Sequence, residues 1–449
     1  MLILKSILQT TQNIDSLSVP QRSSVRLTSH LRHGIRERID APRCGAKPPR
    51  YDAGREVMMK ITDVRTIPLS YRCEKPYMSA AGAQAARSSL LVEVETDNGL
   101  IGIGEAGSAG GPLASTQVVV EQELKPLLLG EDPLLIERLW QKMFQRTRQH
   151  GRRGIVMHAI SGLDIALWDL AGKVAKLPVY RLLGAYRDIV EAYASGGFYQ
   201  EGKGVSAIAE EAASYVAQGY RAMKMKVGRN PSTQTNLREM LAQNELCVVS
   251  LDEDLARVEA VRRALGRDAK LMIDINCAWS PALAIQMGKA LEPYALYWIE
   301  EPVATDDIRG SAEVARALGT AIAGYETEVG LYGFRELIAQ RAVDIIQPDI
   351  AWAGGFTECR RIAAFAHAYN MMLAPHAFSS AITLVAAMHL LASIPNGLIL
   401  EFDQNPNALR QELLKEPIST DGHGFVKLSD RPGLGVELDP ATVEKYRVR

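Results

Sequence analysis

Apolar and polar residues alternate with a period of two in the first patterned part of the chain. Three strand-like runs follow one another there, at residues 61–70, 88–95 and 99–106. Asn98-Gly99 lies between the last two runs, and Asn-Gly between strands is a strong hairpin signal. Apolar residues then recur at helical spacing over residues 115–129, 133–148 and 155–173. An antiparallel sheet followed by helices predicts an α+β domain.

Further along, short apolar runs alternate with helical patterns. Eight strand-like runs occur, at residues 191–195, 222–227, 271–276, 297–300, 321–325, 344–347, 371–375 and 398–401. Eight strands separated by helices predict an α/β parallel barrel of the TIM type. We therefore expect a capping α+β domain at 58–187, a barrel at 188–402, and a turn-rich C-terminal segment at 403–449 that packs back on the capping domain.

Two stretches do not fit this organisation. Residues 1–57 contain ten Lys/Arg and five Asp/Glu without a sustained apolar period, so we expect disorder there. Such a leader is either an organellar transit peptide or an over-extended start, with Met58 or Met59 as the true start. The second stretch, residues 230–250, lengthens one βα unit and is either a long loop over the barrel mouth or a gene-model artefact.

Composition limits the class of protein. The 449 residues are 47% hydrophobic and 23% charged, as in an ordinary soluble globular protein. A formal net charge of -1 gives no reason to expect nucleic acid or a membrane as partner. The five cysteines are scattered and form no Cys-x-x-Cys, which fits a reducing compartment. We expect a cytoplasmic protein, unless the leader directs it to an organelle.

Three acidic residues recur at the period of one βα unit. Asp274, Glu300 and Glu326 are each 26 residues apart, and each follows a short apolar run. At that period the three should lie at the same height at the mouth of the barrel, on three adjacent strands. Converging carboxylates repel one another unless a cation holds them, and oxygen ligands of this kind suit Mg²⁺. The spacing therefore predicts a magnesium site.

Two lysines share one face of the second strand-like run. Lys224 and Lys226 are two residues apart, so both point into the barrel interior or mouth. Two close cations depress each other's pKa, which lets a lysine act as a base near neutral pH. A Lys-x-Lys pair alone is more often a solvated strand edge, but the apolar neighbours and the acids on the next strands favour the catalytic interpretation.

Asp349 and His376 lie 27 residues apart, at the ends of the sixth and seventh runs. A carboxylate beside a histidine fixes its tautomer and raises its pKa, which gives a general acid or base. Asp344, on the same strand as Asp349, is a competing partner for this histidine.

Three further polar residues are candidates for the same site. Glu401, at the end of the eighth run, either points into the mouth towards the lysines or a developing oxyanion, or simply caps a loop. Asn276 and Glu301 stand next to the predicted ligands, and we expect them to orient those ligands.

Several motifs accompany these residues. They are Ser-Gly-Leu-Asp-Ile-Ala-Leu-Trp-Asp at 161–169, Lys-x-Lys at 224–226, Asp-x-Asn at 274–276, Ile-Glu-Glu-Pro at 299–302, Gly-Gly at 354–355 and Pro-Gly-Leu-Gly at 432–435. With Glu326, Asp349 and His376 they resemble the mandelate racemase subgroup of the enolase superfamily, from about residue 59 to the C-terminus. The residues from Glu401 to Asn407 look most like the sugar-acid members, in particular the D-galactarolactone cycloisomerases.

The resemblance implies a (β/α)₇β barrel, a modified TIM barrel, with an N-terminal α+β capping domain completed by the C-terminal segment. The residue roles it implies are Mg²⁺ ligation by Asp274, Glu300 and Glu326, a base at Lys226 with Lys224 as its helper, and an acid/base dyad of His376 and Asp349 on the opposite face. It also implies a homo-oligomer. Tyr325 departs from the family pattern, which has a small residue before the third ligand, and is expected to crowd the metal.

The resemblance further implies a reaction. A sugar-acid carboxylate loses its α-proton through an enediolate stabilised by Mg²⁺. Elimination of water then follows, or ring opening and isomerisation of a lactone. The expected partner is a small sugar acid or its lactone. Two alternatives stay open, a racemase or epimerase of a 2-hydroxy acid, and a non-catalytic sugar-acid-binding protein.

Overall fold

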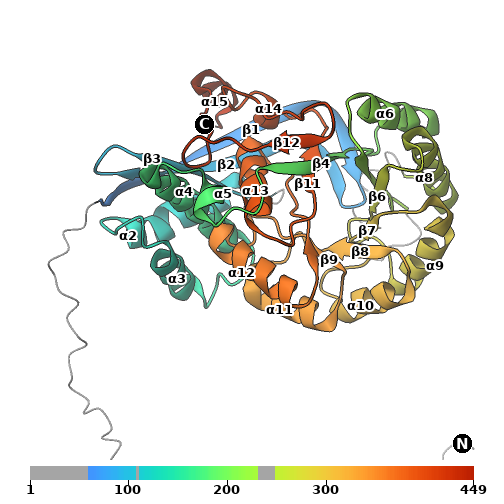
Figure 1. Cartoon of the computed structure of the whole chain (residues 1–449), viewed down its shortest axis with the longest axis horizontal. Coiled ribbons are helices and arrows are strands. Elements are labelled where there is room, and N and C mark those ends of the chain that lie inside the picture. Colours follow the sequence, from blue (N-terminus) through green and yellow to red (C-terminus); the bar gives the residue numbers. More distant parts are fainter. Residues whose placement is uncertain (1–58, 108–110, 231–247, 449) are drawn as a thin grey trace, which may run out of the picture. The chain divides into compact units, whose positions relative to one another are not determined.

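The computed structural model describes residues 59–107, 111–230 and 248–448 of the chain. The expectations for the leader at 1–57, and for most of the stretch at 230–250, lie outside the described residues. Figure 1 shows the described part as a ring of strands and helices with further helices and a sheet beside it.

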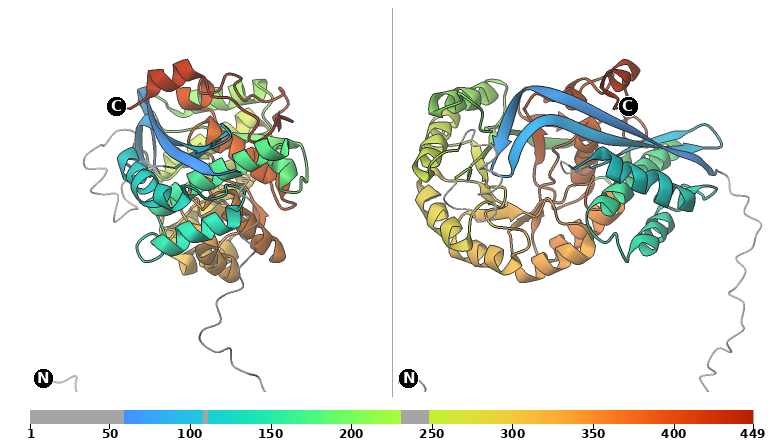
Figure 2. Two further views of the ribbon diagram at one scale, coloured as in Figure 1. Left: turned by 90° about the vertical axis from the view of Figure 1, so that its left-hand side faces the viewer. Right: turned by 180° about the vertical axis from the view of Figure 1, so that it is seen from behind.

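A three-stranded antiparallel sheet begins the described chain. Its strands are β1 (Ile61–Ser79), β2 (Gly82–Thr96) and β3 (Ile101–Ala106), paired in that order. The predicted hairpin joins β2 and β3. Pairing of β1 with β2 continues well beyond the predicted strand, as far as Ser79 opposite Gly82. The long hairpin of β1 and β2 reaches across the ring of strands (Figure 2).

Helices follow this sheet in the chain and pack on it or on one another. They are α1 (Leu113–Val118), the π-helical turn η1 (Val119–Leu124), α2 (Lys125–Leu128), α3 (Ile136–Thr147), α4 (Ile155–Ala175) and α5 (Val179–Leu182). Helix α4 packs closely on β3, because a Cβ at Gly104 would lie 2.0 Å from the carbonyl oxygen of Gly162. Among the described residues α4 alone is long and apolar enough to cross a membrane, but 89% of its apolar window is buried inside the protein, as in a core helix.

Eight parallel strands then alternate with helices. The strands are β4 (Ile189–Ser195), β5 (Ala222–Lys226), β6 (Lys270–Asp274), β7 (Trp298–Glu300), β8 (Ala321–Gly324), β9 (Ile345–Ile346), β10 (Met372–Leu373) and β11 (Leu400–Asp403). From β4 to β10 each strand pairs with the next, and β11 pairs with β4. A parallel bridge from Leu373 to Gly397 joins β10 to the residues before β11 and closes the ring.

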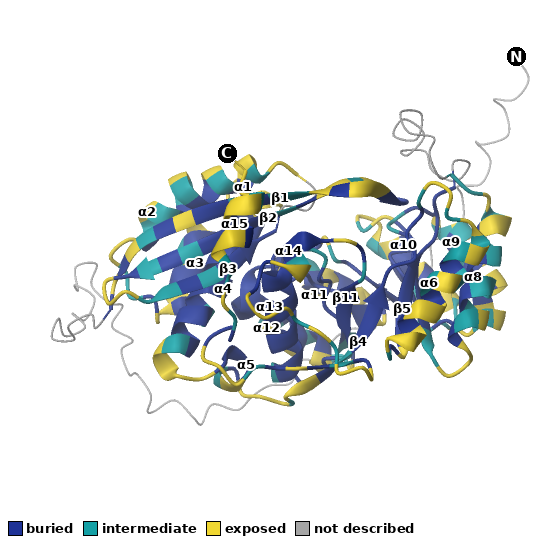
Figure 3. Cartoon of the chain, turned by 90° about the horizontal axis from the view of Figure 1, so that it is seen from above, coloured by how far each residue is buried: buried dark blue, intermediate teal, exposed yellow. Residues whose placement is uncertain are grey.

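The helices between these strands complete the predicted barrel. Within the described residues they are α6 (Val205–Ala217), α8 (Leu251–Leu265), α9 (Pro281–Leu291), the short 3₁₀ helix η2 (Glu292–Tyr294), α10 (Ile308–Ala317), α11 (Gly330–Gln340), α12 (Gly355–Ala368) and α13 (Ala381–Ser393). Exposed residues lie on the outer faces of the helices, and buried ones on the strands (Figure 3). The α/β class and the (β/α)₇β barrel with an α+β cap are confirmed.

Side chains fill the interior of the barrel. Eight buried residues, one from nearly every strand, form this inner core: Tyr193, Ala222, Met272, Trp298, Ala323, Ile345, Ala374 and Ile399. The barrel is therefore a packed support rather than a pore. Polar side chains take over from this apolar layer at the carboxyl ends of the strands.

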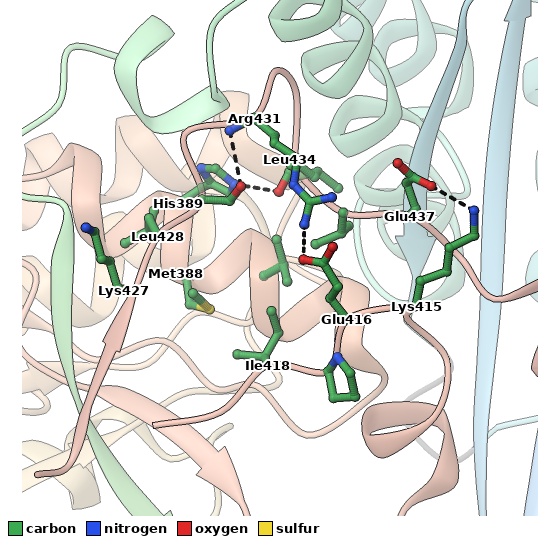
Figure 4. A pocket seen from close by; sticks show the side chains of 15 residues that line it. Met388, His389, Lys415, Glu416, Ile418, Lys427, Leu428, Arg431, Leu434 and Glu437 are labelled. Atoms are coloured by element: carbon green, nitrogen blue, oxygen red, sulfur yellow. Dashed lines mark hydrogen bonds and ion pairs between the residues drawn. The ribbon is translucent and has the colours of Figure 1, made fainter. Parts of the chain in front are cut away.

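The C-terminal segment contacts both parts of the molecule. Its elements are α14 (Ala408–Gln411), β12 (Phe425–Lys427) and α15 (Pro440–Tyr446). Strand β12 pairs with β4 of the barrel, and Arg447 bridges to Leu69 of the capping sheet. A cavity of about 290 Å³ lies between this segment and α13, where buried His389 faces exposed ion pairs such as Arg431 with Glu416 (Figure 4).

One buried carboxylate ties three segments together. Asp169 on α4 accepts hydrogen bonds from the backbone N–H groups of Ile103 (2.9 Å) and Leu434 (2.7 Å), and it pairs with Lys173 (2.6 Å). This aspartate thus joins α4 to β3 and to the Pro-Gly-Leu-Gly motif of the C-terminal segment.

We expect Asp169→Ala to lower the free energy of unfolding by roughly 2–4 kcal/mol, because a buried and a partly buried N–H group lose their acceptor. Urea denaturation followed by circular dichroism measures this change. Asp268→Ala, at an exposed position, is the control and should stay within about 0.5 kcal/mol of the parent protein. An equally small effect of Asp169→Ala would show that the hydrogen bonds of Asp169 do not stabilise the contact between α4, β3 and the C-terminal segment.

Candidate metal and acid/base site

Three charged residues stand side by side at the carboxyl ends of adjacent strands. In the parallel register Lys226 on β5 lies opposite Asp274 on β6, which lies opposite Glu300 on β7. Side chains in register point to the same side of a sheet, so all three face the barrel mouth.

Glu326 reaches the same place by a different route. The expectation that it would share the strand register is wrong, because β8 ends at Gly324 and Ala323 is the residue opposite Glu300. Glu326 comes from the following turn. Even so, one carboxylate oxygen from each of Asp274, Glu300 and Glu326 lies within 4.8 Å of the other two. These three carboxylates form a group that could hold a metal ion.

The two lysines pair with these carboxylates. Lys224 Nζ donates to Glu300 Oε1 and lies 2.9 Å from Glu401 Oε1. Lys226 Nζ donates to Asp274 Oδ2. Both lysines are buried, so each ammonium group depends on these partners for compensation of its charge.

The surrounding acids decide the protonation of both lysines. Burial by itself lowers the pKa of Lys226, and Lys224 lowers it further, but Asp274, Glu326 and Glu300 together raise it above the ordinary value. The pKa of Lys224 is raised well above its usual range, because Glu300 and Glu401 outweigh burial. Lys224 thus lowers the pKa of Lys226, as predicted, but the neighbouring acids raise that pKa by more.

A histidine and an aspartate complete the ring of polar groups. His376 Nδ1 lies 2.6 Å from Asp349 Oδ2, and the backbone N–H of Ala351 donates to Asp349 Oδ1 at 2.7 Å. His376 Nε2 points towards Glu326, at 3.5 Å from Oε2. The alternative partner Asp344 instead accepts from the N–H of Ile322, so that hypothesis is wrong.

Glu401 combines the two interpretations given for it. Its Oε1 accepts from Ser195 Oγ at 2.7 Å and contacts Lys224, while its Oε2 accepts from the N–H of Ala377 at 3.0 Å. Burial by itself raises the pKa of Glu401, but Lys224 and His376 lower it well below its usual range. Glu401 thus faces the lysine and also holds the residue next to the histidine.

Neighbouring groups orient the three carboxylates. The backbone and side-chain N–H groups of Asn276 donate to Asp274 at 2.9 and 3.2 Å. Glu301 Oε1 accepts from the N–H groups of Tyr325 (3.1 Å) and Glu326 (3.2 Å), which fixes the turn that carries Glu326.

Two groups that hold Glu300 were missed in the sequence. Trp298 Nε1 and Gln347 Nε2 donate to Glu300 Oε2 at 3.0 and 2.8 Å. Trp298 lies two residues before Glu300 on the same strand face, a spacing that could have indicated it.

Tyr325 does not crowd the three carboxylates. Its backbone adopts a positive φ of 73°, and its ring packs in the outer core between strands and helices. The hydroxyl group lies 3.1 Å from Ser311 Oγ on α10. The crowding expectation is therefore wrong, because the left-handed turn at Tyr325 sends its side chain away from that of Glu326.

Aromatic rings border the site from loops that no sequence pattern connects. The ring of Phe198 lies 4.9 Å from Lys226 Nζ. The ring centroids of Trp352 and His376 are 4.9 Å apart, and Phe378 lies 6.2 Å from His376 by the same measure. These rings give the lysine and the histidine apolar neighbours.

Comparison with known proteins places this arrangement in a family. Residues 61–184 match the mandelate racemase / muconate lactonizing enzyme N-terminal domain, and residues 207–442 match the enolase C-terminal domain-like model. The chain belongs to the mandelate racemase/muconate lactonizing enzyme family of the enolase superfamily. The family resemblance seen in the sequence is confirmed.

Individual relatives cover nearly the whole described chain. Arabinonate dehydratase of Saccharolobus solfataricus is 37% identical over 87% of this chain and 100% of its own length. D-galactarolactone cycloisomerase of Agrobacterium fabrum is 34% identical over 87% of this chain and 99% of its own. The crystal structure of a racemase from Streptomyces coelicolor with bound magnesium is 34% identical, has a TM-score of 0.77, and matches 86% of this chain and 100% of that one.

In the metal-free protein, His376 is predicted to have a raised pKa. Burial by itself lowers the pKa of His376, but Glu326 and Asp349 outweigh it and raise the pKa to about 10. Since this value lies above the ordinary 6.5, the stability gained from the pair is complete below pH 6.5 and is lost as the pH rises towards 10.

We expect Asp349→Asn to lower the pKa of His376, because the variant removes a negative partner. NMR titration of labelled histidines in metal-free protein measures this. His389, whose pKa burial lowers to about 4, is an internal reference that should not respond. An unchanged His376 titration in the variant would show that Asp349 does not control its proton.

Proposed function

We propose that this protein is a Mg²⁺-dependent acid-sugar dehydratase or sugar-lactone cycloisomerase. The observation that carries the proposal is one juxtaposition: three carboxylates within 4.8 Å of one another, with Lys226 against one of them and His376 beside another. The named activities of arabinonate dehydratase and D-galactarolactone cycloisomerase support the substrate class, a sugar acid or its lactone.

The donor set fits a hard divalent cation. Asp274, Glu300 and Glu326 would hold it, since three carboxylate groups supply only oxygen ligands. When bound, Mg²⁺ would neutralise the substrate carboxylate and stabilise the negative charge that develops as the α-proton leaves.

Lys226 is the proposed base for the α-proton. Its ammonium group must give up Asp274 and its proton before it can accept another, and cation binding at Asp274 would favour both changes. Lys224, paired with Glu300 and Glu401, stays protonated and lowers the pKa of Lys226.

His376 is the proposed acid on the other side of the site. Asp349 holds Nδ1, which leaves Nε2 to deliver a proton to the departing oxygen. In a dehydratase that oxygen leaves as water, whereas in a cycloisomerase it is the ring oxygen of a lactone. Since every predicted ligand and base is present, nothing favours a non-catalytic protein.

We expect activity to require a divalent cation. Chelation should reduce turnover to background, and Mg²⁺ but not Ca²⁺ should restore it, because Ca²⁺ prefers looser, higher coordination. Calorimetry of Mg²⁺ binding gives a readout besides activity. Glu300→Gln should bind at least about tenfold more weakly, whereas Glu131→Gln in the capping domain should bind normally. Full turnover by metal-stripped protein would refute the mechanism.

The two proposed bases can be separated by hydrogen exchange. Lys226→Ala should abolish both product formation and exchange of the substrate α-hydrogen in D₂O, because no base remains. His376→Asn should stop product formation but keep some exchange. NMR of both variants tests this, with a sugar acid or lactone that the parent protein converts. Lys289→Ala, on the exposed face of α9, is the control.

Other exchange patterns have definite meanings. A racemase predicts that each variant exchanges one enantiomer only. The reverse pattern would assign the base to His376, since substrate configuration decides which face carries the proton. Undiminished turnover in either variant would remove that residue from the mechanism.

A further inference from the structure

A buried arginine of the capping sheet contacts the loop that carries His376. Arg87 lies on β2 with 4% of its surface exposed. Its Nη2 donates to the carbonyl oxygen of Phe378 at 2.5 Å, and its Nη1 donates to the hydroxyl of Tyr77 at 2.8 Å. Phe378 is only two residues beyond His376, so the capping domain holds the backbone of the histidine loop directly.

The guanidinium group of Arg87 makes two further contacts. It lies 3.6 Å from the centre of the Phe378 ring, and Nη2 is 3.3 Å from Asp403 Oδ2 on β11. A planar, forked cation is needed for these contacts together, since a lysine ammonium cannot stack on the ring and bridge two acceptors in the same way. Because Nη1 and Nη2 both contact protein groups, Arg87 is placed to position the loop rather than to bind substrate.

The capping sheet holds the far end of the same segment as well. Glu105 on β3 is buried and accepts hydrogen bonds from Ser380 Oγ (2.6 Å), Thr383 Oγ1 (2.7 Å) and the N–H of Thr383 (2.9 Å). Residues 376–383 are thus fixed to the capping domain at two points, with His376 at the end nearer Arg87.

The lysine side of the site contacts the cap through Arg229, and also through Phe198, whose ring centroid lies 4.9 Å from that of Tyr77 and 5.6 Å from that of Phe378. There Arg229, three residues beyond Lys226, donates to the carbonyl oxygen of Ser79 at 2.7 Å. Asp274 and Glu300 receive their hydrogen bonds from barrel residues, namely Asn276, Trp298 and Gln347. Arg87 bonds directly to the backbone of the histidine loop, whereas it reaches Lys226 only through the packing of Phe378 and Tyr77 on Phe198.

We propose that Arg87 is a positioning residue for His376: it fixes the backbone at Phe378 and so sets the direction in which the imidazole delivers its proton. This inference rests on the proposed function, because it assigns a consequence to the proton transfer by His376.

Arg87→Lys tests the proposal by comparison with the two base variants. The measured quantities are product formation and α-hydrogen exchange in D₂O on one substrate. We expect product formation to fall roughly 100-fold, as misplacement of a catalytic group by about 1 Å can do. The ratio of exchange to product formation should rise, as in His376→Asn. It should not follow Lys226→Ala, in which exchange and product formation are lost together. Arg72→Lys, on the exposed face of the same hairpin, should match the parent protein.

A milder variant guards against loss of folding. Tyr77→Phe removes one acceptor of Arg87 and keeps the charge, so it should shift the same ratio by a smaller factor. Circular dichroism and thermal melting show whether each variant is folded. If Arg87→Lys does not fold, Tyr77→Phe decides: a shifted ratio supports the proposal, and an unchanged ratio overturns it.

Failure of this inference differs from failure of the proposed function. A parent protein that neither exchanges the α-hydrogen nor forms product from sugar acids or lactones refutes the proposed function. An active parent protein with a folded Arg87→Lys variant that loses neither reaction, or loses both in the Lys226→Ala pattern, overturns only the role of Arg87.

Discussion

Compensation of buried charge is the constraint on which the site depends. Six carboxylates converge at the barrel mouth, those of Asp274, Glu300, Glu301, Glu326, Asp349 and Glu401, against three basic groups, Lys224, Lys226 and His376. Each buried charge is costly unless it is paired. The lysines satisfy part of this demand, and burial with neighbouring acids raises the pKa of Glu301 to about 8. The remaining excess of negative charge is what a divalent cation would relieve.

That compensation requires the strands to keep their register. Lys226, Asp274 and Glu300 meet because they stand opposite one another on three adjacent strands. A shift by one residue would turn each of them towards the helices, into an apolar layer without partners. The inner apolar core supports this register from below, since Met272 and Trp298 lie two residues before Asp274 and Glu300 on the same faces.

The sequence predicted what depends on local period and missed what depends on distant contacts. The spacing of 26 residues located the three carboxylates because one βα unit repeats along the chain. It could not reveal that Glu326 lies beyond the end of the strand. The chain makes a left-handed turn at Tyr325, and a non-glycine residue does not indicate such a turn in the sequence. The contacts of Arg87 with Phe378 and of Gln347 with Glu300 join residues far apart in the chain, and no periodic pattern records them.

The motif at 161–169 shows how the capping domain supports the proposed acid/base dyad without supplying a group to it. Ser161 Oγ accepts from the N–H of Gly354, and Asp164 accepts from Thr357, at the start of the helix that follows Asp349. In the same way, Arg87 and Glu105 of the capping domain form hydrogen bonds with the loop after His376. The segments that follow both halves of the dyad are thus held by the cap, whereas Asp274 and Glu300 accept their hydrogen bonds within the barrel. Glu401 links the two sides, since it holds Ala377 and pairs with Lys224, but it does so from the barrel. Substitutions in the cap can therefore alter proton delivery to the leaving group while the hydrogen bonds of Asp274 and Glu300 stay in place.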